Sequence, residues 1–315
     1  VANTTKPLVL LVSDEEYFPQ VLDLIEHLCG YQPEHPAVIP YFNPITPLVL
    51  NQGTVNKMFT AIERGFPFIF SSYGMAGMTA PITPAGSLTL LNAELLAGLV
   101  LSQVIREGSP IILGSLPMFF DMKQMTPLFD PLTHVLNLAS AEMMHFYRLP
   151  HCGTSGSGEG WGMDLMGSGV MWANHLASAL GRAGLCPFVG SNFGSLVFSP
   201  LSAVYADEVI AQSVRVADGF ELSKEAINLE SIREIGPGGD FLASDQTYQR
   251  FRDAYYQSEI FPVFDLQSWR ENGSPPAEKY LRERTLEVME HPRVPDDHEA
   301  IIKRGDAYIK KLKQG

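Results

Sequence analysis

The first 200 residues repeat one order of hydrophobic and polar positions. A short apolar run is followed by a loop rich in glycine, proline and polar residues, and then by a segment with apolar side chains at helical spacing. This order predicts alternating strands and helices, with strands over residues 8–13, 37–42, 66–72, 110–115, 145–152 and 186–190. After residue 200 the spacing is only helical, which predicts helices over 203–217, 221–235, 246–256, 276–289 and 301–313.

Strands that alternate with helices pair in parallel through right-handed crossovers, so two α/β folds fit the pattern: a TIM-type (β/α)8 barrel and an open, doubly wound sheet. No Gly-x-Gly-x-x-Gly motif follows the first strand and no Walker loop is present, which favours the barrel. Only about six strands are evident, fewer than the eight of a closed barrel. We therefore expect residues 1–200 to form an incomplete barrel, with 201–315 as closing helices and a C-terminal helical annex of the same domain.

The chain is acidic, with 35 Asp and Glu against 22 Lys and Arg and a formal net charge of −13. This balance argues against nucleic acid or an anionic membrane as a partner, because either would need a basic surface. The longest apolar run, 95–105, is shorter than the ~20 residues of a membrane span and is better explained as a buried helix.

The three cysteines, Cys29, Cys152 and Cys186, have no close spacing that would indicate a zinc ribbon or a disulfide framework. Residues 1–7 lack the cationic start and apolar core of a signal peptide. We therefore expect a cytoplasmic protein without a metal site. We further expect it to form a homo-oligomer.

The loop expected over residues 73–86 directly follows the third predicted strand and is unusually restrained. Gly74 and Gly77 permit backbone conformations and close approaches that a side chain would forbid, while Pro81 and Pro84 stiffen the path toward the next helix. Loops at the carboxyl ends of barrel strands carry the active site. A surface connection without chemistry is an equal alternative for this loop.

Familiar catalytic motifs are absent, since the sequence has no Gly-x-Ser-x-Gly and no His-Glu-x-x-His. Two carboxylates, Asp121 and Glu159, follow predicted strands and are candidate catalytic groups, although loop capping is the commoner use of such residues. His151, in the fifth predicted strand, is a candidate base or ligand, with a core or rim position as the commoner alternative.

Aromatic side chains are frequent in the same predicted strand ends and loops. Several rings at one mouth would attract a quaternary ammonium through their electron-rich faces, at ~0.5–2 kcal/mol per ring. For each ring taken singly, core packing is the commoner role. The rings are Phe42, Tyr73, Phe119, Phe120, Tyr147, Trp161, Trp172 and Phe193.

Several motifs occur in an order that resembles a known family. The most specific is Met-Ala-Gly-Met-Thr-Ala-Pro at 75–81. The complete set lies at 40–48, 75–86, 92–98 with Gln103, 110–115, 146–150, 236–239 and Thr247 with Phe251-Arg252. Together these motifs resemble the trimethylamine methyltransferase family of corrinoid-dependent enzymes over nearly the whole chain.

This resemblance implies a TIM-type barrel that transfers a methyl group from an amine to the Co(I) of a separate corrinoid protein, with no cofactor bound tightly by the chain itself. Members of the family are longer, so the chain resembles their C-terminal two-thirds. The barrel strands that the pattern lacks would then be the N-terminal ones.

The loop after the fifth predicted strand departs from the family pattern. Trimethylamine enzymes place pyrrolysine there, whereas residues 155–160 are Ser-Gly-Ser-Gly-Glu-Gly. The chain therefore resembles pyrrolysine-free relatives that demethylate quaternary amines such as glycine betaine. A quaternary nitrogen leaves as a neutral tertiary amine, so Co(I) can displace it without a covalent helper.

The resemblance, together with the position of each residue, supplies a set of expected site residues. Asp121 and Glu159 are the expected catalytic groups, and Gly74, Gly77 and Gly153 are expected to face the cofactor. The residues expected to bind substrate are Phe42, Asn43, Tyr73, Met75, Thr79, Phe120, Tyr147, Arg148, His151 and Trp161, with Arg148 or His151 available for a substrate carboxylate. The alternative is a noncatalytic quaternary-amine-binding protein or a degenerate family member.

Overall fold

The computed structural model describes residues 1–30, 35–153 and 160–313, and it shows an α/β protein built on a mostly parallel sheet. The parallel strands lie side by side in chain order, and β5 pairs antiparallel with β4. The strands are β1 (Leu8–Leu10), β2 (Val38–Phe42), β3 (Phe68–Ala76), β4 (Ile111–Asp121), β5 (Thr126–Leu128) and β6 (His151–Cys152).

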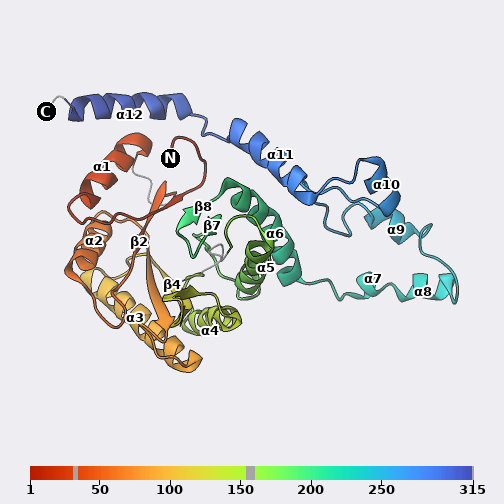
Figure 1. Ribbon diagram of the computed structural model, residues 1–315, viewed down its shortest axis with the longest axis horizontal. Coiled ribbons are helices and arrows are strands. Elements are labelled where there is room, and N and C mark those ends of the chain that lie inside the picture. The colour runs from red at the N-terminus through yellow and green to blue at the C-terminus, as the bar shows by residue number, and fades with distance from the viewer. Residues whose placement is uncertain (31–34, 154–159, 314–315) are drawn as a thin grey trace.

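Helices connect consecutive parallel strands and lie on the outer side of an arc of strands (Figure 1). Neighbouring strands that follow each other in the sequence, each with its own connecting helix, are compatible with a TIM-type fold. The described strands do not close a barrel, so the complete barrel stays a prediction. The outer helices are α1 (Phe18–Cys29), α2 (Gln52–Glu63), α3 (Pro84–Ile105), α4 (Pro131–Tyr147), α5 (Leu165–Leu180) and α6 (Pro200–Asp218).

The two faces of the sheet bury different sets of side chains, because successive residues of a strand point to opposite faces. On the outer face, Phe70 and its β4 partner Leu113 are fully buried in the main hydrophobic core with residues of the helices. On the inner face, Tyr41 and its β3 partner Ile69 belong to a second, smaller cluster. The side chains of the inner face therefore form a cluster separate from the helices.

Helix α3 packs unusually close to the sheet. A Cβ atom placed on Gly98 would lie 2.2 Å from Cδ1 of Phe70, so only glycine permits this approach. Among the described helices, α3 alone has the length and apolar composition that could cross a membrane. The core helix of a folded domain can have the same length and apolar composition, and Leu91 and Leu95 of α3 are buried.

Two strands extend further than predicted, and β3 includes the start of the loop expected over 73–86. Strand β3 continues to Ala76 and β4 continues to Asp121, and the two pair in register as far as Ala76 with Phe119. The predicted strand over 110–115 is therefore only the first half of β4, and the residues that follow it form the second half and the turn into β5. Hydrogen bonding between the strands explains the difference, since the ladder extends past the apolar runs that marked the strands in the sequence.

The fifth and sixth predicted strands were mostly wrong. Helix α4 runs through Tyr147 and ends at Arg148, whose left-handed backbone (φ 58°) forms the C-cap, so only His151 and Cys152 are in strand β6. The apolar side chains that suggested a strand are explained by packing, because Tyr147 and Leu149 both contact the main core. The sixth predicted strand, 186–190, is not a strand; a parallel bridge between Cys152 and Leu185 comes just before it.

The residues after 185 form a small hairpin and then helices. Strands β7 (Ser191–Asn192) and β8 (Val197–Phe198) pair antiparallel. The helices expected over 203–217, 276–289 and 301–313 are confirmed. The helix expected over 221–235 is divided at Asn228, whose backbone is left-handed, and the helix expected over 246–256 already ends at Arg250. The helices beyond α6 are α7 (Lys224–Ile227), α8 (Leu229–Ile235), α9 (Asp245–Arg250), α10 (Leu266–Glu271), α11 (Ala277–Glu290) and α12 (His298–Leu312).

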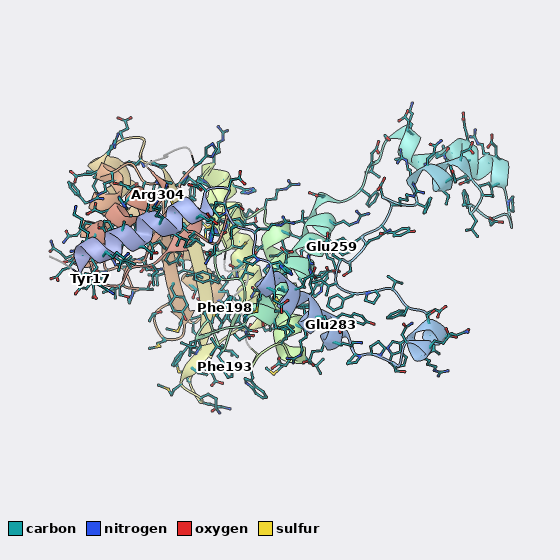
Figure 2. The ribbon with its side chains drawn as sticks, turned by 90° about the horizontal axis from the view of Figure 1, so that it is seen from above. Tyr17, Phe193, Phe198, Glu259, Glu283 and Arg304 are labelled. Atoms are coloured by element: carbon teal, nitrogen blue, oxygen red, sulfur yellow. The ribbon has the colours of Figure 1, made fainter. Side chains whose placement is uncertain are left out.

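Two of these late helices pack against the outer helices of the α/β part. Leu281 of α11 is buried where that helix packs on α6, and Arg304 of α12 donates from Nε to the carbonyl oxygen of Leu28 at the end of α1 (3.0 Å). Helices α7 to α10 extend away from the rest of the chain (Figures 1 and 2).

Candidate functional site

A cavity of about 540 Å³ opens at the carboxyl ends of β2, β3 and β4 on the inner face of the sheet. Ligand sites in parallel α/β folds occur at this edge of the sheet. We call it the aromatic cavity. Its lining residues are Leu11, Tyr41, Asn43, Pro44, Thr46, Tyr73, Met75, Thr79, Leu116, Met118, Phe188, Gly194 and Ser195.

Three aromatic rings from three different segments line the aromatic cavity. The rings of Tyr41 and Phe188 meet edge to face, with centroids 5.9 Å apart and planes at 88°. Tyr73 stands two residues before Met75 on the same strand face. Burial raises the pKa of the Tyr41 phenol above its ordinary range and raises the pKa of Tyr73 as well, so both rings are neutral at physiological pH.

Strand register brings two thioethers together beside these rings. Met75 of β3 is the direct partner of Met118 of β4, and Tyr73 is the partner of Leu116. All four side chains line the aromatic cavity. Polarisable sulfur and ring faces favour methyl groups and soft cations over strongly hydrated ions.

Short polar side chains fix the backbone around the rings. Asn43 donates from Nδ2 to the carbonyl oxygen of Ser71 (2.7 Å) and, over a longer distance, to the hydroxyl of Tyr41 (3.4 Å). Thr79 accepts from the backbone N–H of Met75 (2.9 Å) in the turn that follows β3. These bonds hold Tyr41 and Met75 in place relative to the cavity.

A buried carboxylate stabilises the loop after β2, which forms another wall of the aromatic cavity. Glu94 of α3 accepts hydrogen bonds from the hydroxyl of Thr46 (2.8 Å) and the backbone N–H of Leu48 (2.6 Å), and from the hydroxyl of Ser72 on β3. Thr46 lines the aromatic cavity, so Glu94 joins the loop after β2 to both β3 and α3.

Four of the expected substrate-binding residues line this cavity: Asn43, Tyr73, Met75 and Thr79. Phe42 lies on the opposite face of β2, where its ring meets Phe18 of α1 edge on at 5.5 Å. The structure therefore assigns Phe42 to the main core.

The expected cofactor glycines of the third loop serve packing and turn geometry. A Cβ atom on Gly74 would lie 2.9 Å from Leu91, so this residue faces α3 rather than the cavity. Gly77 has φ 93° and forms the turn after β3. Neither glycine is among the lining residues.

Asp121 and Phe120 lie where β4 turns into β5. The carboxylate of Asp121 accepts from the backbone N–H groups of Lys123 (2.7 Å) and Gln124 (3.2 Å), so it stabilises the turn. Neither Asp121 nor Phe120 lines the aromatic cavity. The position of Asp121 matches the loop-capping alternative, and its catalytic role stays a prediction.

Tyr147, Arg148 and His151 lie at the other end of the sheet layer, near the start of β6. Tyr147 accepts from Nδ2 of Asn92 (3.1 Å), and Arg148 caps α4. His151 is 4% exposed and stands beside Leu113, which faces the helices. Burial, with a smaller effect of nearby His145, lowers the pKa of His151 to about 4.

Two further expected residues lie at opposite ends of α5: Gly153 is beside Ser178 and Ala183 at its end, and Trp161 precedes its start. Gly153 donates from its backbone N–H to Leu185 (3.0 Å), and Trp161 is 76% exposed. The N-cap of α5 is Asp164, whose pKa is lowered by hydrogen bonds from the backbone N–H groups of Gly167 and Trp161. Glu159 lies outside the described residues.

Sequence reasoning missed several residues that line or support the aromatic cavity. Tyr41 could have been found, because strand alternation places it on the same face as Asn43. Phe188 carried no local signal, since its position beside Tyr41 depends on how the chain returns after α5. Glu94 lies in an apolar helical stretch and gave no indication of its role.

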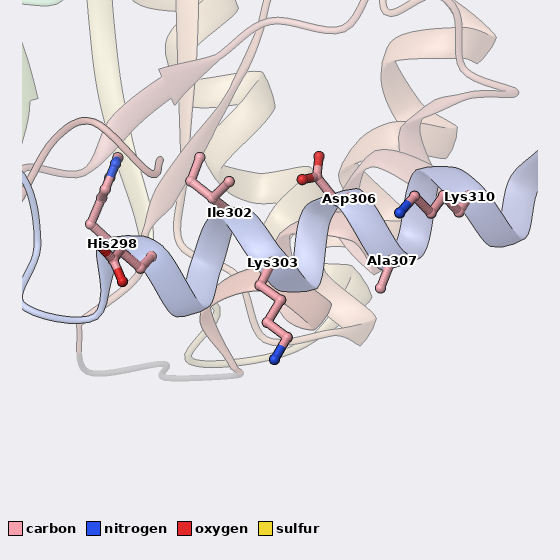
Figure 3. A pocket seen from close by; sticks show the side chains of 7 residues that line it. His298, Ile302, Lys303, Asp306, Ala307 and Lys310 are labelled. Carbon is pink, nitrogen blue, oxygen red and sulfur yellow. The ribbon is translucent and has the colours of Figure 1, made fainter.

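Two other hollows are less suited to a small apolar ligand. One is a groove of about 480 Å³ formed only by residues of α12, including His298, Lys303 and Lys310 (Figure 3). Another, of about 820 Å³, lies between residues 4–6, α6 and α11 and is lined by side chains of both charges, including Glu208 and Arg284. Within the described ranges, no group of three or more His, Cys, Asp or Glu side chains could hold a metal ion.

The fold and the aromatic cavity define an α/β protein whose cavity lies at the carboxyl ends of its parallel strands. The family model for trimethylamine methyltransferase (MTTB) matches residues 1–315, and the chain belongs to this family. The family resemblance expected from the sequence motifs is thereby confirmed.

Named relatives agree with this assignment. The chain is 25% identical to Trimethylamine methyltransferase MttB from Desulfitobacterium hafniense, with 92% of the chain and 59% of the relative covered. It is 26% identical to Trimethylamine methyltransferase MttB from Methanosarcina thermophila, with 93% and 62% covered. It is also 27% identical to Glycine betaine methyltransferase from Desulfitobacterium hafniense, with 75% and 50% covered. The chain thus spans about three-fifths or less of the length of these relatives.

Proposed function

We propose that the chain is part of a methyltransferase that moves a methyl group from a quaternary amine, such as glycine betaine, to the Co(I) of a separate corrinoid protein in the cytoplasm. The observation that carries this proposal is the aromatic cavity, which the rings of Tyr41, Tyr73 and Phe188 line together with the thioethers of Met75 and Met118 in a member of this family. A methylated cation fits such a lining because the ring faces attract it, and because it loses less hydration on binding than a strongly hydrated ion would.

The residues of the chain bind and orient the substrate. Ring faces hold the N-methyl groups, and the apolar lining excludes water from the carbon–nitrogen bond that breaks. The electron pair of that bond remains on nitrogen, which leaves as a neutral tertiary amine. The corrinoid, carried by the partner protein, supplies the nucleophile and accepts the methyl group.

The proposal assigns substrate contact to Asn43, Tyr73, Met75 and Thr79, with Tyr41 and Phe188 added from the structure. It does not use Arg148 or His151, since both lie away from the cavity lining. A substrate that carries a carboxylate would direct that group toward the open mouth, where Gly194 and Ser195 are exposed.

A single-turnover experiment tests the proposal. The 315-residue chain is mixed with a Co(I) corrinoid protein and glycine betaine, and the cobalt absorption is followed with time. We expect a substrate-dependent spectral change and formation of dimethylglycine. Neither event should occur when the amine or the chain is omitted, and their absence in the complete mixture would contradict a catalytic role.

The second candidate is a noncatalytic quaternary-amine-binding member of the family. It is favoured by one observation, that the described strands form an open sheet beside the cavity rather than a closed barrel. Saturable binding of a quaternary amine together with no methyl transfer in the experiment above would support this candidate over the enzyme.

A further inference from the structure

Glu94 is a buried carboxylate that has no cationic partner in the described part of the chain. Its side chain is on α3 and the residue is 3% exposed. The three donors that meet it, Thr46, Leu48 and Ser72, are all neutral. No ion pair among the described residues includes Glu94. An acceptor-only group such as an ionised carboxylate matches three donors, but burial without a countercharge is costly.

This carboxylate lies directly behind the wall of the aromatic cavity. Thr46 is a lining residue, and its hydroxyl donates to Oε2 of Glu94. The carboxylate is therefore separated from the cavity by one small side chain. The described lining itself contains no charged side chain.

We propose that Glu94 is the buried countercharge that makes the aromatic cavity selective for a cation over a neutral molecule of the same shape. This inference rests on the proposed function, because that function places a quaternary amine in the cavity. The protein would then carry the negative charge in its interior, and the ligand would bring the positive charge that balances it.

A buried charge acts over a longer distance than an exposed one. Few water molecules and ions lie between it and the ligand, so the attraction is screened much less than attraction by surface groups. Ring faces attract any methylated cation at short range. Glu94 would add a second attraction that depends on charge and not on contact.

The experiment compares two probes that differ only in charge. Choline is a trimethylammonium alcohol, and 3,3-dimethyl-1-butanol has carbon in place of the charged nitrogen. Both are titrated into the wild-type chain and into Glu94→Gln and Glu94→Asp variants by calorimetry. We expect Glu94→Gln to lower the preference for choline by about tenfold and Glu94→Asp, which keeps the charge, to preserve most of it.

The outcomes distinguish an electrostatic role of Glu94 from a purely structural one. Equal weakening of both probes by Glu94→Gln would show that Glu94 only positions the Thr46 loop, and would overturn the inference. A full preference for choline in Glu94→Gln would overturn it while leaving the proposed function intact. Equal affinity of the wild-type chain for both probes would overturn both.

A second measurement needs only the wild-type chain, in case Glu94→Gln does not fold. The preference for choline is measured from low salt to ~1 M salt, where the Debye length falls to about 3 Å. We expect the preference to persist, since Glu94 is buried. A preference that disappears with salt would come from the exposed acidic surface of a chain with net charge −13, and would overturn the inference.

Discussion

The ring of Tyr41 meets the ring of Phe188 edge to face, with 5.9 Å between centroids and 88° between planes. Tyr41 belongs to the second strand of the sheet, whereas Phe188 belongs to the segment after α5. The contact therefore joins the two sides of the aromatic cavity. Its strength should influence both the stability of the fold and the shape of the site.

A double-mutant cycle measures that contact. Edge-to-face pairs contribute ~0.5–1.5 kcal/mol beyond the area that they bury. We expect Tyr41→Leu and Phe188→Leu to be less destabilising together than the sum of the single substitutions, by an amount in this range, in urea unfolding at pH 7. Strict additivity would mean that the two rings contribute to stability independently.

Tyr73→Ala should weaken binding of a quaternary amine by ~0.5–2 kcal/mol, or roughly twofold to thirtyfold, because the ring lines the cavity. The measurement is titration with choline and with 3,3-dimethyl-1-butanol. The cation should lose more affinity than its neutral analogue.

Trp161→Ala provides the matched control for this prediction. Trp161 is 76% exposed and does not line the cavity, so choline affinity should change by no more than about twofold. Unchanged binding in Tyr73→Ala, or a large loss in Trp161→Ala, would place the cation site elsewhere.

Gly98→Ala should destabilise the protein by about 1–3 kcal/mol. The added methyl group would lie 2.2 Å from the ring of Phe70, which is fully buried between α3 and the sheet. The control is Gly169→Ala in α5, where a Cβ atom meets nothing within 4 Å. Since alanine favours a helix over glycine, this variant should gain about 0.5–1 kcal/mol. Similar effects of the two substitutions in urea unfolding would contradict the close packing of α3.

Folding stability should fall as the pH is lowered from 6.5 toward 4. Burial lowers the pKa of His151 from 6.5 to about 4, and the pKa of His175 is lowered to about 4 in the same way. Above pH 6.5 each imidazole is neutral in the folded and unfolded states. Between the two pKa values only the unfolded state binds the proton, so each group removes about 1.4 kcal/mol of stability per pH unit.

The His151→Leu variant tests this pH dependence. The free energy of unfolding is measured from pH 7.5 to pH 4.5 for the wild-type chain and the variant. The value at pH 7.5 reports the packing effect of the substitution alone. We expect a shallower decline in the variant below pH 6.5, and an identical slope would show that His151 does not stay neutral in the folded chain.

The sequence by itself determined the alternation of strands and helices, most of the helices after residue 200 and membership of the family. These features follow from local periodicity and from ordered motifs. It also pointed to four residues that line the aromatic cavity, Asn43, Tyr73, Met75 and Thr79, because each lies at or beyond the end of an apolar run that forms a parallel strand. Residues at such ends are brought to one edge of the sheet by any parallel α/β fold.

Tertiary structure alone decided which other residues share the site. Strands β3 and β4 extend beyond their apolar runs because they pair with each other, and this register places Met118 beside Met75. Phe188 reaches Tyr41 only through the return of the chain after α5, and Glu94 reaches Thr46 only because α3 packs closely on the sheet. Periodicity along the chain depends only on residues that are close in the sequence. These contacts join segments that are far apart in the sequence and come together only in the folded protein.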